Sequence, residues 1–537
     1  MPRGAGHPAM PALALIVVAL LGGIALRGTQ ALAKRTLLHD EARSYLTAAG
    51  NDGRYSALAQ ARQPAYPFGA WAPAAEWKAF FRVSKPFAFQ QIARDLAAHD
   101  LHPPLYFWLL HLWSLAVGIH IWTGPLLNLL IAGLTTGALF GLASGLLGNR
   151  FQAGVVAALW ALSPGAIAAS FEARPYDLLA LITALFVWRV VELIRGRRRM
   201  GWRAAALALT TGCGLLTHYQ FVIAIVAAGP LIIWAGWRRG RRHVAVGLAA
   251  LLAGGWLFLL LFPGCIGQLR GGSLDLPIQP LADVAGRARV TWASLLSFAV
   301  PWEPWNVGGP AGAAWLVALT LLLAGLGGLA LWWGQRGGRR VHPVPAGRGL
   351  VLYFCLALAG APALLYLLSV NPPHAMGSKY LSMAWPLAAF LPVLLVDALG
   401  RDLLYVVLVV LMAAAGVLGV WRTIRQEMGY PDTSAILAQA DRLLCDSVAK
   451  SVAPRVFWHA GDDTPIFCAA QSYLLRHPEE WIGRLDNALY VSDLRFGGSP
   501  ERRESILQLI AGRYAAIQRI EGGIFGGQEV FEIYERR

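Results

Sequence analysis

The feature that most constrains the fold is a series of apolar segments, each close to 20 residues long, with short polar stretches between them. A helix needs about 20 mainly apolar residues to cross the hydrocarbon core of a bilayer. Hydrophobic residues make up 56% of the 537 residues and charged residues only 14%, and the mean hydropathy is +0.51. These values exclude an ordinary water-soluble globular protein. The sequence therefore predicts a polytopic α-helical membrane protein.

The basic residues mark the sides of the membrane. The formal net charge is +16, but arginine falls in bursts between apolar segments, at 195–203, 238–242 and 336–340. Such bursts are typical of cytoplasmic loops and can also hold anionic lipid head groups. Because the arginines form no single basic face, nucleic acid is excluded as a partner.

The same pattern predicts about eleven spans. Arg3 precedes the first apolar segment, which lacks a small-residue cleavage site, so we expect an uncleaved helix and a cytoplasmic N-terminus. Crossing from the first outer loop to the burst at 195 requires an odd number of spans. The segment 103–118 is short and opens with two prolines, so we expect it to lie in the interface, although the sequence leaves a crossing open. The expected spans are 9–26, 122–147, 151–168, 175–194, 202–217, 219–236, 244–262, 311–334, 348–370, 380–397 and 403–421.

Two polar regions are expected outside the membrane. Residues 27–121 form a long first loop within a transmembrane catalytic domain at 1–421, and Trp71 to Phe81 in this loop is predicted to be an interfacial helix. Residues 422–537 are predicted to form a small α/β domain. Polar and apolar residues alternate in three of its segments, 455–459, 488–492 and 529–534, and the segment 501–513 has a helical pattern.

Five cysteines are scattered through the chain without a C-x-x-C motif, which argues against a thiolate metal site or a redox motif. Cys445 and Cys468 share the polar C-terminal region. If that region is extracytoplasmic, a disulfide between them is possible, and the sequence leaves this question open.

The predicted topology brings several polar side chains to the outer face. A carboxylate there can accept a proton from an acceptor hydroxyl, and a lysine or arginine can bind a phosphate and stabilise the charge on a leaving group. No nucleotide-binding glycine loop occurs, which suits a donor that is already activated and held in the membrane. The candidate residues are Asp40, Glu41, His102, Glu172, Arg174, Tyr176, His218, Tyr219, Lys379 and Tyr380.

Each candidate also has a structural explanation. Asp40 and Glu41 can be solvated loop residues, Arg174 can neutralise Glu172, and Lys379 can anchor a helix at the interface. A transporter or lipid flippase is the alternative function. That class is expected to carry ionisable residues in the middle of its spans and inverted repeats, whereas these spans are largely free of mid-membrane charge.

Five motifs together resemble the bacterial GT-C glycosyltransferases, in the group of the protein O-mannosyltransferases and the lipid A aminoarabinose transferases. The resemblance covers about residues 9–421 and reaches the tail only loosely. It implies an inverting transfer from a polyprenyl-phosphate sugar, hexosyl or pentosyl, at the outer face of a bacterial inner membrane. The motifs are H-D-E-A-R-S-Y, H-P-P-L-Y-F-W-L-L-H-L-W, F-E-A-R-P-Y, L-T-H-Y and S-K-Y-L-S-M-A-W-P.

The resemblance also implies roles for residues. Asp40 corresponds to the acidic base of the first loop and Lys379 to the late basic residue that contacts the donor phosphate, where many relatives have arginine. Glu172, Arg174 and Tyr176 are placed at the edge of the site. No cofactor is required; the carboxylates offer a divalent metal possible ligands, but their spacing does not demand one. The acceptor stays open between a glycolipid, a polysaccharide and a protein.

Overall fold

The computed structural model contains two compact units, which are described separately. The helical unit comprises Met1–Ala31, Pro125–Phe171 and Pro175–Arg422, and the mixed unit comprises Leu32–Gly124, Glu172–Arg174 and Thr423–Arg537. The structure describes residues 9–61, 64–196, 199–271, 284–301, 346–368, 378–400, 403–429, 433–493, 498–524 and 528–537.

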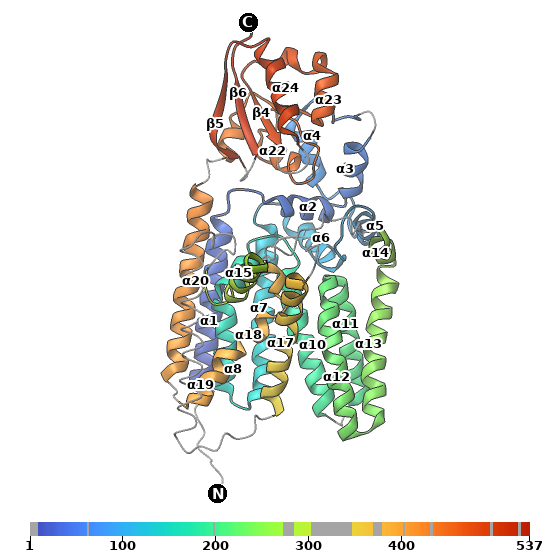
Figure 1. Cartoon of the computed structure of the whole chain (residues 1–537), viewed down its shortest axis with the longest axis vertical. Coiled ribbons are helices and arrows are strands. Elements are labelled where there is room, and N and C mark those ends of the chain that lie inside the picture. Colours follow the sequence, from blue (N-terminus) through green and yellow to red (C-terminus); the bar gives the residue numbers. More distant parts are fainter. Residues whose placement is uncertain are drawn as a thin grey trace. The chain divides into compact units, whose positions relative to one another are not determined.

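The helical unit is built from apolar helices, most of which follow the predicted spans (Figure 1). Their order is α1 (Ala9–Leu32), α7 (Thr123–Leu147), α8 (Arg150–Leu162), α9 (Pro164–Ala169), α10 (Tyr176–Arg195), α11 (Met200–Thr217), η2 (Tyr219–Phe221), α12 (Val222–Arg239), α13 (Arg241–Leu261), α14 (Cys265–Gly271), α15 (Val284–Leu296), α17 (Ala346–Leu368), η5 (Ser378–Leu381), α18 (Trp385–Ala388), α19 (Phe390–Leu399) and α20 (Leu403–Gly429).

Some predicted spans are interrupted. The segment 151–168 is divided where Ser163 caps α9 and Pro164 begins it, because proline cannot continue the hydrogen-bonding pattern of α8. The segment 380–397 contains three short helices. In the described part of the chain, α7, α13, α17 and α20 contain stretches long and apolar enough to cross a membrane. The predicted span at 311–334 lies outside the described residues, so the count of eleven stays a prediction.

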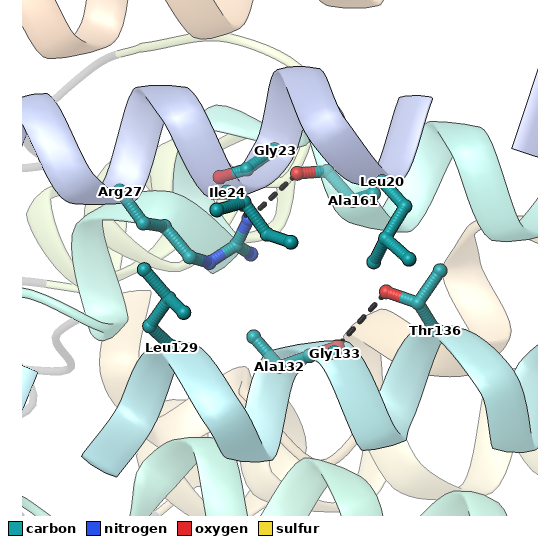
Figure 2. A pocket seen from close by; sticks show the side chains of 9 residues that line it. All are labelled: Leu20, Gly23, Ile24, Arg27, Leu129, Ala132, Gly133, Thr136 and Ala161. Atoms are coloured by element: carbon teal, nitrogen blue, oxygen red, sulfur yellow. Dashed lines mark hydrogen bonds between the residues drawn. The ribbon is translucent and has the colours of Figure 1, made fainter. Parts of the chain in front are cut away.

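Helices α1 and α8 approach closely at a glycine. A Cβ atom on Gly23 would lie 2.6 Å from the carbonyl oxygen of Ala161. One turn later Arg27 is buried, and its guanidinium donates to that carbonyl at 2.7 Å and to Ser170 Oγ at 3.0 Å. Figure 2 shows the Arg27 side chain reaching the Ala161 carbonyl at the edge of a small space that α7 lines on the other side. Small residues permit such close packing between membrane helices.

We predict that Gly23→Ala lowers the melting temperature of the purified protein in detergent. The added methyl group would force α1 and α8 apart, and overpacking of this kind costs about 1–3 kcal/mol. Gly28→Ala on the same helix is the control, because a Cβ there meets nothing within 4 Å. Equal melting temperatures for the two variants would contradict the packing assigned to Gly23.

The mixed unit combines the first loop with the tail. The loop contributes α2 (His39–Ala48), α3 (Asp52–Ala59), β1 (Trp71–Pro73), α4 (Ala74–Lys78), η1 (Ala79–Phe81), α5 (Phe89–His99) and α6 (Leu105–Val117). The tail contributes α21 (Thr433–Ala438), β2 (Arg442–Cys445), α22 (Ala453–His459), β3 (Pro465–Cys468), α23 (Gln471–Arg476), η6 (Pro478–Glu480), η7 (Ile482–Arg484), β4 (Ala488–Asp493), α24 (Pro500–Ala511), β5 (Ile517–Ile524) and β6 (Gln528–Ile533).

One sheet joins these segments, in the order β1-β3-β2-β4-β6-β5. Strand β2 runs parallel to β3 and β4, and the remaining pairs are antiparallel. Helices α23 and α24 lie side by side and bury their apolar side chains with those of β2 and β4 (Figure 1). Two tail predictions are confirmed: the alternating segments 488–492 and 529–534 are strands β4 and β6, and 501–513 is largely helix α24.

Other predictions for the polar regions are wrong. The tail is not a separate domain, because Trp71 of the first loop pairs with Phe467 of the tail in the same sheet. The segment 71–81 is a strand followed by two short helices rather than an interfacial helix, since Trp77 is buried and stacks on Phe457. The segment 455–459 is helical, in α22.

Helix α6 and the tail cysteines bear on two questions that the sequence leaves open. Helix α6 has 13 residues, fewer than a span requires, and packs against α2 and α5. Its interfacial placement stays a prediction that its length supports. Cys445 and Cys468 are buried free thiols on neighbouring strands, where they are register partners.

Candidate functional site

The acidic motif of the first loop forms the start of α2. Asp40 and Glu41 lie in the first turn of this helix, where the positive end of the helix dipole favours carboxylates. Adjacent residues on a helix point in different directions, and here the two carboxylates differ in exposure. Asp40 is half-buried, whereas Glu41 is completely buried. Of the pair, Asp40 is therefore the carboxylate that is partly exposed to solvent.

The Glu41 carboxylate is held by three donors within the mixed unit. The Lys34 ammonium lies 2.8 Å from Oε2, the Leu38 amide donates to Oε2 at 3.0 Å, and the Ala173 amide donates to Oε1 at 2.9 Å. Burial raises the pKa of the Glu41 carboxyl, and the charge of Lys34 opposes this shift. Sequence reasoning predicts a substrate contact for Glu41, but this geometry gives it a positioning role between α2 and the segment Glu172–Arg174.

A second polar group connects Arg174 to the segment Asp100-Leu101-His102, called the D-L-H motif below. The Arg174 guanidinium donates to His102 Nε2 at 2.9 Å and to Ser44 Oγ on α2 at 3.4 Å. His102 Nδ1 lies 2.6 Å from Asp100 Oδ1, and Arg43 of α2 contacts the other oxygen of Asp100 at 3.3 Å. Sequence reasoning missed Asp100, Arg43 and Ser44, although an aspartate two residues before a histidine is a visible signal.

The contacts of His102 define its protonation. Because Nε2 accepts from Arg174, the proton of the neutral ring is on Nδ1 and is donated to Asp100. Burial and the neighbouring Arg174 charge lower the pKa of His102, so the imidazole is neutral at physiological pH. Burial acts to raise the pKa of Asp100, but the hydrogen bond from His102 and the charges around it hold that pKa well below its usual range.

The tail holds the residue just before α2. Arg455 of α22 is buried and donates through Nε to the Leu37 carbonyl at 2.7 Å. The Leu37 amide donates to His459 Nε2 of the same helix at 3.4 Å. Both main-chain groups of Leu37 are therefore fixed by α22. No sequence motif in the tail predicts this role, because it depends on contacts between residues about 420 positions apart in the chain.

The helical unit brings together four other predicted residues. Lys379 Nζ lies 5.7 Å from the centre of the Tyr176 ring, within range of a cation–π interaction. The Tyr176 ring also lies 6.1 Å from the His218 ring and 6.2 Å from the Tyr380 ring. Gln220 Nε2 donates to the Tyr380 carbonyl at 2.7 Å, which ties η5 to η2. This group joins a lysine to three aromatic rings.

Two further predicted residues are Tyr219 and Glu172. The Tyr219 hydroxyl donates to Gln268, and its ring packs against Phe258, so it points toward α13 and α14. Glu172 is half-buried in the mixed unit. Among the residues that the structure describes, the one group of ligand atoms close enough to share a metal ion is His477, Glu479 and Glu480, near the surface of the mixed unit.

Comparison with known proteins identifies the fold. Residues 101–265 match the family model described as dolichyl-phosphate-mannose-protein mannosyltransferase. The structure is similar to ArnT from Cupriavidus metallidurans bound to undecaprenyl phosphate, with 12% identity, a TM-score of 0.54 and coverage of 98% of both chains. It is also similar to the oligosaccharyltransferase of Archaeoglobus fulgidus, with 13% identity, a TM-score of 0.45 and coverage of 97% of this chain and 73% of that one.

A search of curated proteins finds no match to this chain. The similarity to ArnT, which extends over nearly the whole of both chains, shows a GT-C membrane fold and agrees with the resemblance found in the sequence motifs.

We predict that Arg455→Leu loosens the start of α2 and leaves the rest of the protein folded. The variant loses a buried hydrogen bond from a charged donor, worth about 1.5–3 kcal/mol, so amide exchange at 38–42 is expected to accelerate about 10- to 150-fold. Arg442→Leu is the control, because Arg442 also donates to a main-chain carbonyl, that of Arg484, but in a solvent-exposed hydrogen bond. Unchanged exchange in Arg455→Leu would show that α22 does not hold the motif.

We also predict a pH dependence that arises at His102. Because its pKa is lowered in the folded protein, the unfolded chain binds a proton first as the pH falls through about 6.5, and stability is lost below that pH. The melting temperature should fall between about pH 7.5 and about pH 5.5, and by less in His102→Gln. The more exposed His477 provides the control variant, His477→Gln. An equal fall in all three proteins would exclude His102 as the source.

Proposed function

We propose that the protein is an inverting glycosyltransferase that moves a sugar from a polyprenyl-phosphate donor to a hydroxyl acceptor at the extracytoplasmic face of a bacterial inner membrane. The observation that carries the proposal is the placement of Asp40. It lies in a helical first turn that a buried ion pair, the Glu172–Arg174 segment and α22 all hold in position. The GT-C fold and the undecaprenyl phosphate bound to the similar ArnT supply the donor class.

Asp40 is assigned the role of general base. Its carboxylate accepts the proton of the acceptor hydroxyl while the hydroxyl oxygen attacks the anomeric carbon of the donor. The bond between that carbon and the phosphate oxygen breaks with its electron pair, and polyprenyl phosphate leaves. One displacement inverts the anomeric configuration. Glu41 does not take the proton in this scheme, because its oxygens are occupied by Lys34 and by two amides.

Lys379 is assigned the contact with the donor phosphate. A lysine ammonium supplies a point charge, and a charge-assisted contact strengthens as the leaving phosphate gains charge. The Tyr176 ring lies beside the ammonium of this lysine, and the His218 and Tyr380 rings pack in turn against Tyr176. Their aromatic faces also suit an isoprenoid chain or a sugar ring. Whether the sugar is a hexose or a pentose is left open by this assignment.

The acceptor classes consistent with the proposal are a glycolipid, a polysaccharide and a protein hydroxyl. The orientation that we propose places the N-terminus in the cytoplasm and the mixed unit outside it. Mass spectrometry of envelope glycolipids and glycoproteins from a deletion strain identifies the missing sugar and its acceptor. Those two compounds then define the transfer assay used for the variants below.

We predict that Asp40→Asn abolishes transfer while expression and membrane insertion stay normal. Asparagine keeps the size of the side chain but cannot accept the proton, and loss of a general base costs about 100- to 10,000-fold in rate. Asp463→Asn, at an exposed position in the mixed unit, is the control and should retain full activity. Near-normal turnover by Asp40→Asn would remove Asp40 from the mechanism.

We predict that Lys379→Ala lowers donor-dependent efficiency about 10- to 150-fold, because the lost contact to phosphate is worth about 1.5–3 kcal/mol. Lys379→Arg should keep much of the activity, since the charge remains. Lys379→Gln keeps polarity and approximate length without the charge and should be inactive. If Lys379→Gln is active, the lysine serves only as an interfacial anchor and the phosphate contact is wrong.

A further inference from the structure

A cavity in the mixed unit lies beyond the carboxyl ends of two parallel strands. It is open to solvent and offers about 120 Å³ to the centres of water-sized molecules. The loop after β2 and the loop after β3 form one wall, and the first loop of the chain forms the other. Its lining includes Leu58, Phe68, Val448, Ala470, Tyr473 and Arg476.

The position of this cavity in the sheet is informative. The chain leaves β2 through α22 to reach β3 on one side of β2, and it leaves β3 through α23 to reach β4 on the other side. Right-handed crossovers in opposite directions place the two helices on opposite faces of the sheet. Consistent with this, α22 packs against α4, whereas α23 packs against α24. The cavity therefore lies at a topological switch point, where open α/β sheets bind their ligands.

The walls of the cavity are held by buried hydrogen bonds. Asp446, next to the end of β2, accepts from Gln471 Nε2 of α23 at 2.7 Å and from the Tyr490 hydroxyl at 2.8 Å. The Tyr55 hydroxyl of α3 donates to the Val448 carbonyl at 3.0 Å and so connects the two walls. Because its walls are already ordered, such a cavity loses little conformational entropy when it binds a ligand.

The lining indicates the chemistry of the ligand. Leu58, Phe68 and Val448 form an apolar surface, and the polar groups gather at α23. There the Tyr473 hydroxyl donates to Glu480 at 2.8 Å, and Arg476 and Ser472 lie on the same helix. The Arg476 cation and the hydroxyls of Ser472 and Tyr473 beside an aromatic ring offer both donors and acceptors. A neutral sugar presents hydroxyls and an apolar ring face together, which matches the Arg476 and Ser472 side chains beside the Tyr473 ring and the apolar surface.

We propose that this cavity is a saccharide-binding site, distinct from the residues around Asp40. Its ligand is a neutral sugar residue. If the protein transfers a sugar as proposed above, the natural occupant is a sugar of the acceptor glycan, which the cavity would hold apart from the reacting hydroxyl. The binding itself does not depend on that reaction.

The test uses the full-length protein in detergent and saturation-transfer NMR with neutral probes at millimolar concentration: methyl α-mannoside, methyl β-galactoside and N-acetylglucosamine. Ala59→Trp fills the cavity and should remove the signal of the sugar that binds. Ala57→Trp is the matched control, because Ala57 is exposed on the same helix α3 and does not line the cavity. Asp40→Asn should bind as the wild type does.

A second variant guards against misfolding of the first. Arg476→Ala changes an exposed side chain and should weaken binding about tenfold, the effect of one lost charge-assisted hydrogen bond. The absence of a signal from all three sugars in the wild type, or equal binding by the wild type and Ala59→Trp, overturns the proposal. Binding of inorganic phosphate that Ala59→Trp abolishes would also overturn it, because the cavity would then be an anion site.

A transfer assay separates this inference from the proposed function. With an acceptor glycan, Ala59→Trp is expected to raise the KM for the acceptor and to leave kcat and the KM for the donor unchanged. If Ala59→Trp loses sugar binding but keeps the acceptor KM, the cavity binds a sugar without taking part in acceptor recognition, and that role is overturned. If the protein shows no transfer at all, the NMR result still decides the saccharide site.

Discussion

The buried ion pair between Lys34 and Glu41 is the interaction that holds the acidic motif, and so Asp40, in place within the mixed unit. Both side chains are shielded from water, so removing one partner would leave an unpaired buried charge, at a cost of about 3–5 kcal/mol. Glu41 also accepts from the amides of Leu38 and Ala173. One carboxylate thereby joins the segment after α1, the start of α2 and the segment that precedes α10. The position of Asp40 follows from that arrangement.

Burial divides the roles of the two acidic residues. The sequence shows an acidic pair at the start of a helix, and both members have the same chemistry. Only the packing of Ala173 and Lys34 shows that the oxygens of Glu41 are fully occupied while Asp40 is half-buried. The assignment of the base to Asp40 was thus available from the motif, but the reason for excluding its neighbour was not.

The parts predicted well from the sequence are those that depend on local pattern. Apolar length locates most helices of the helical unit, and alternation locates β4 and β6. Contacts between distant segments were missed: β1 is only three residues long, and its pairing with β3 leaves no local signal. The segment 455–459 is predicted to alternate as in a strand, but it lies in the short helix α22, where the adjacent residues Val456 and Phe457 are both buried. In so short a segment, the spacing of apolar residues does not distinguish a helix from a strand.

The group around Arg174 shows why an arginine suits this position. Its planar head donates to Ser44 through one nitrogen and to His102 through the other, so it connects α2 to the D-L-H motif with a single side chain. A lysine presents one flexible ammonium and cannot reproduce that fork. The acceptor on His102 exists only while the ring is neutral, and Asp100 fixes the required tautomer. The geometry of α2 is therefore coupled to the protonation of His102. Asp100, which fixes the tautomer, is not itself assigned a substrate contact.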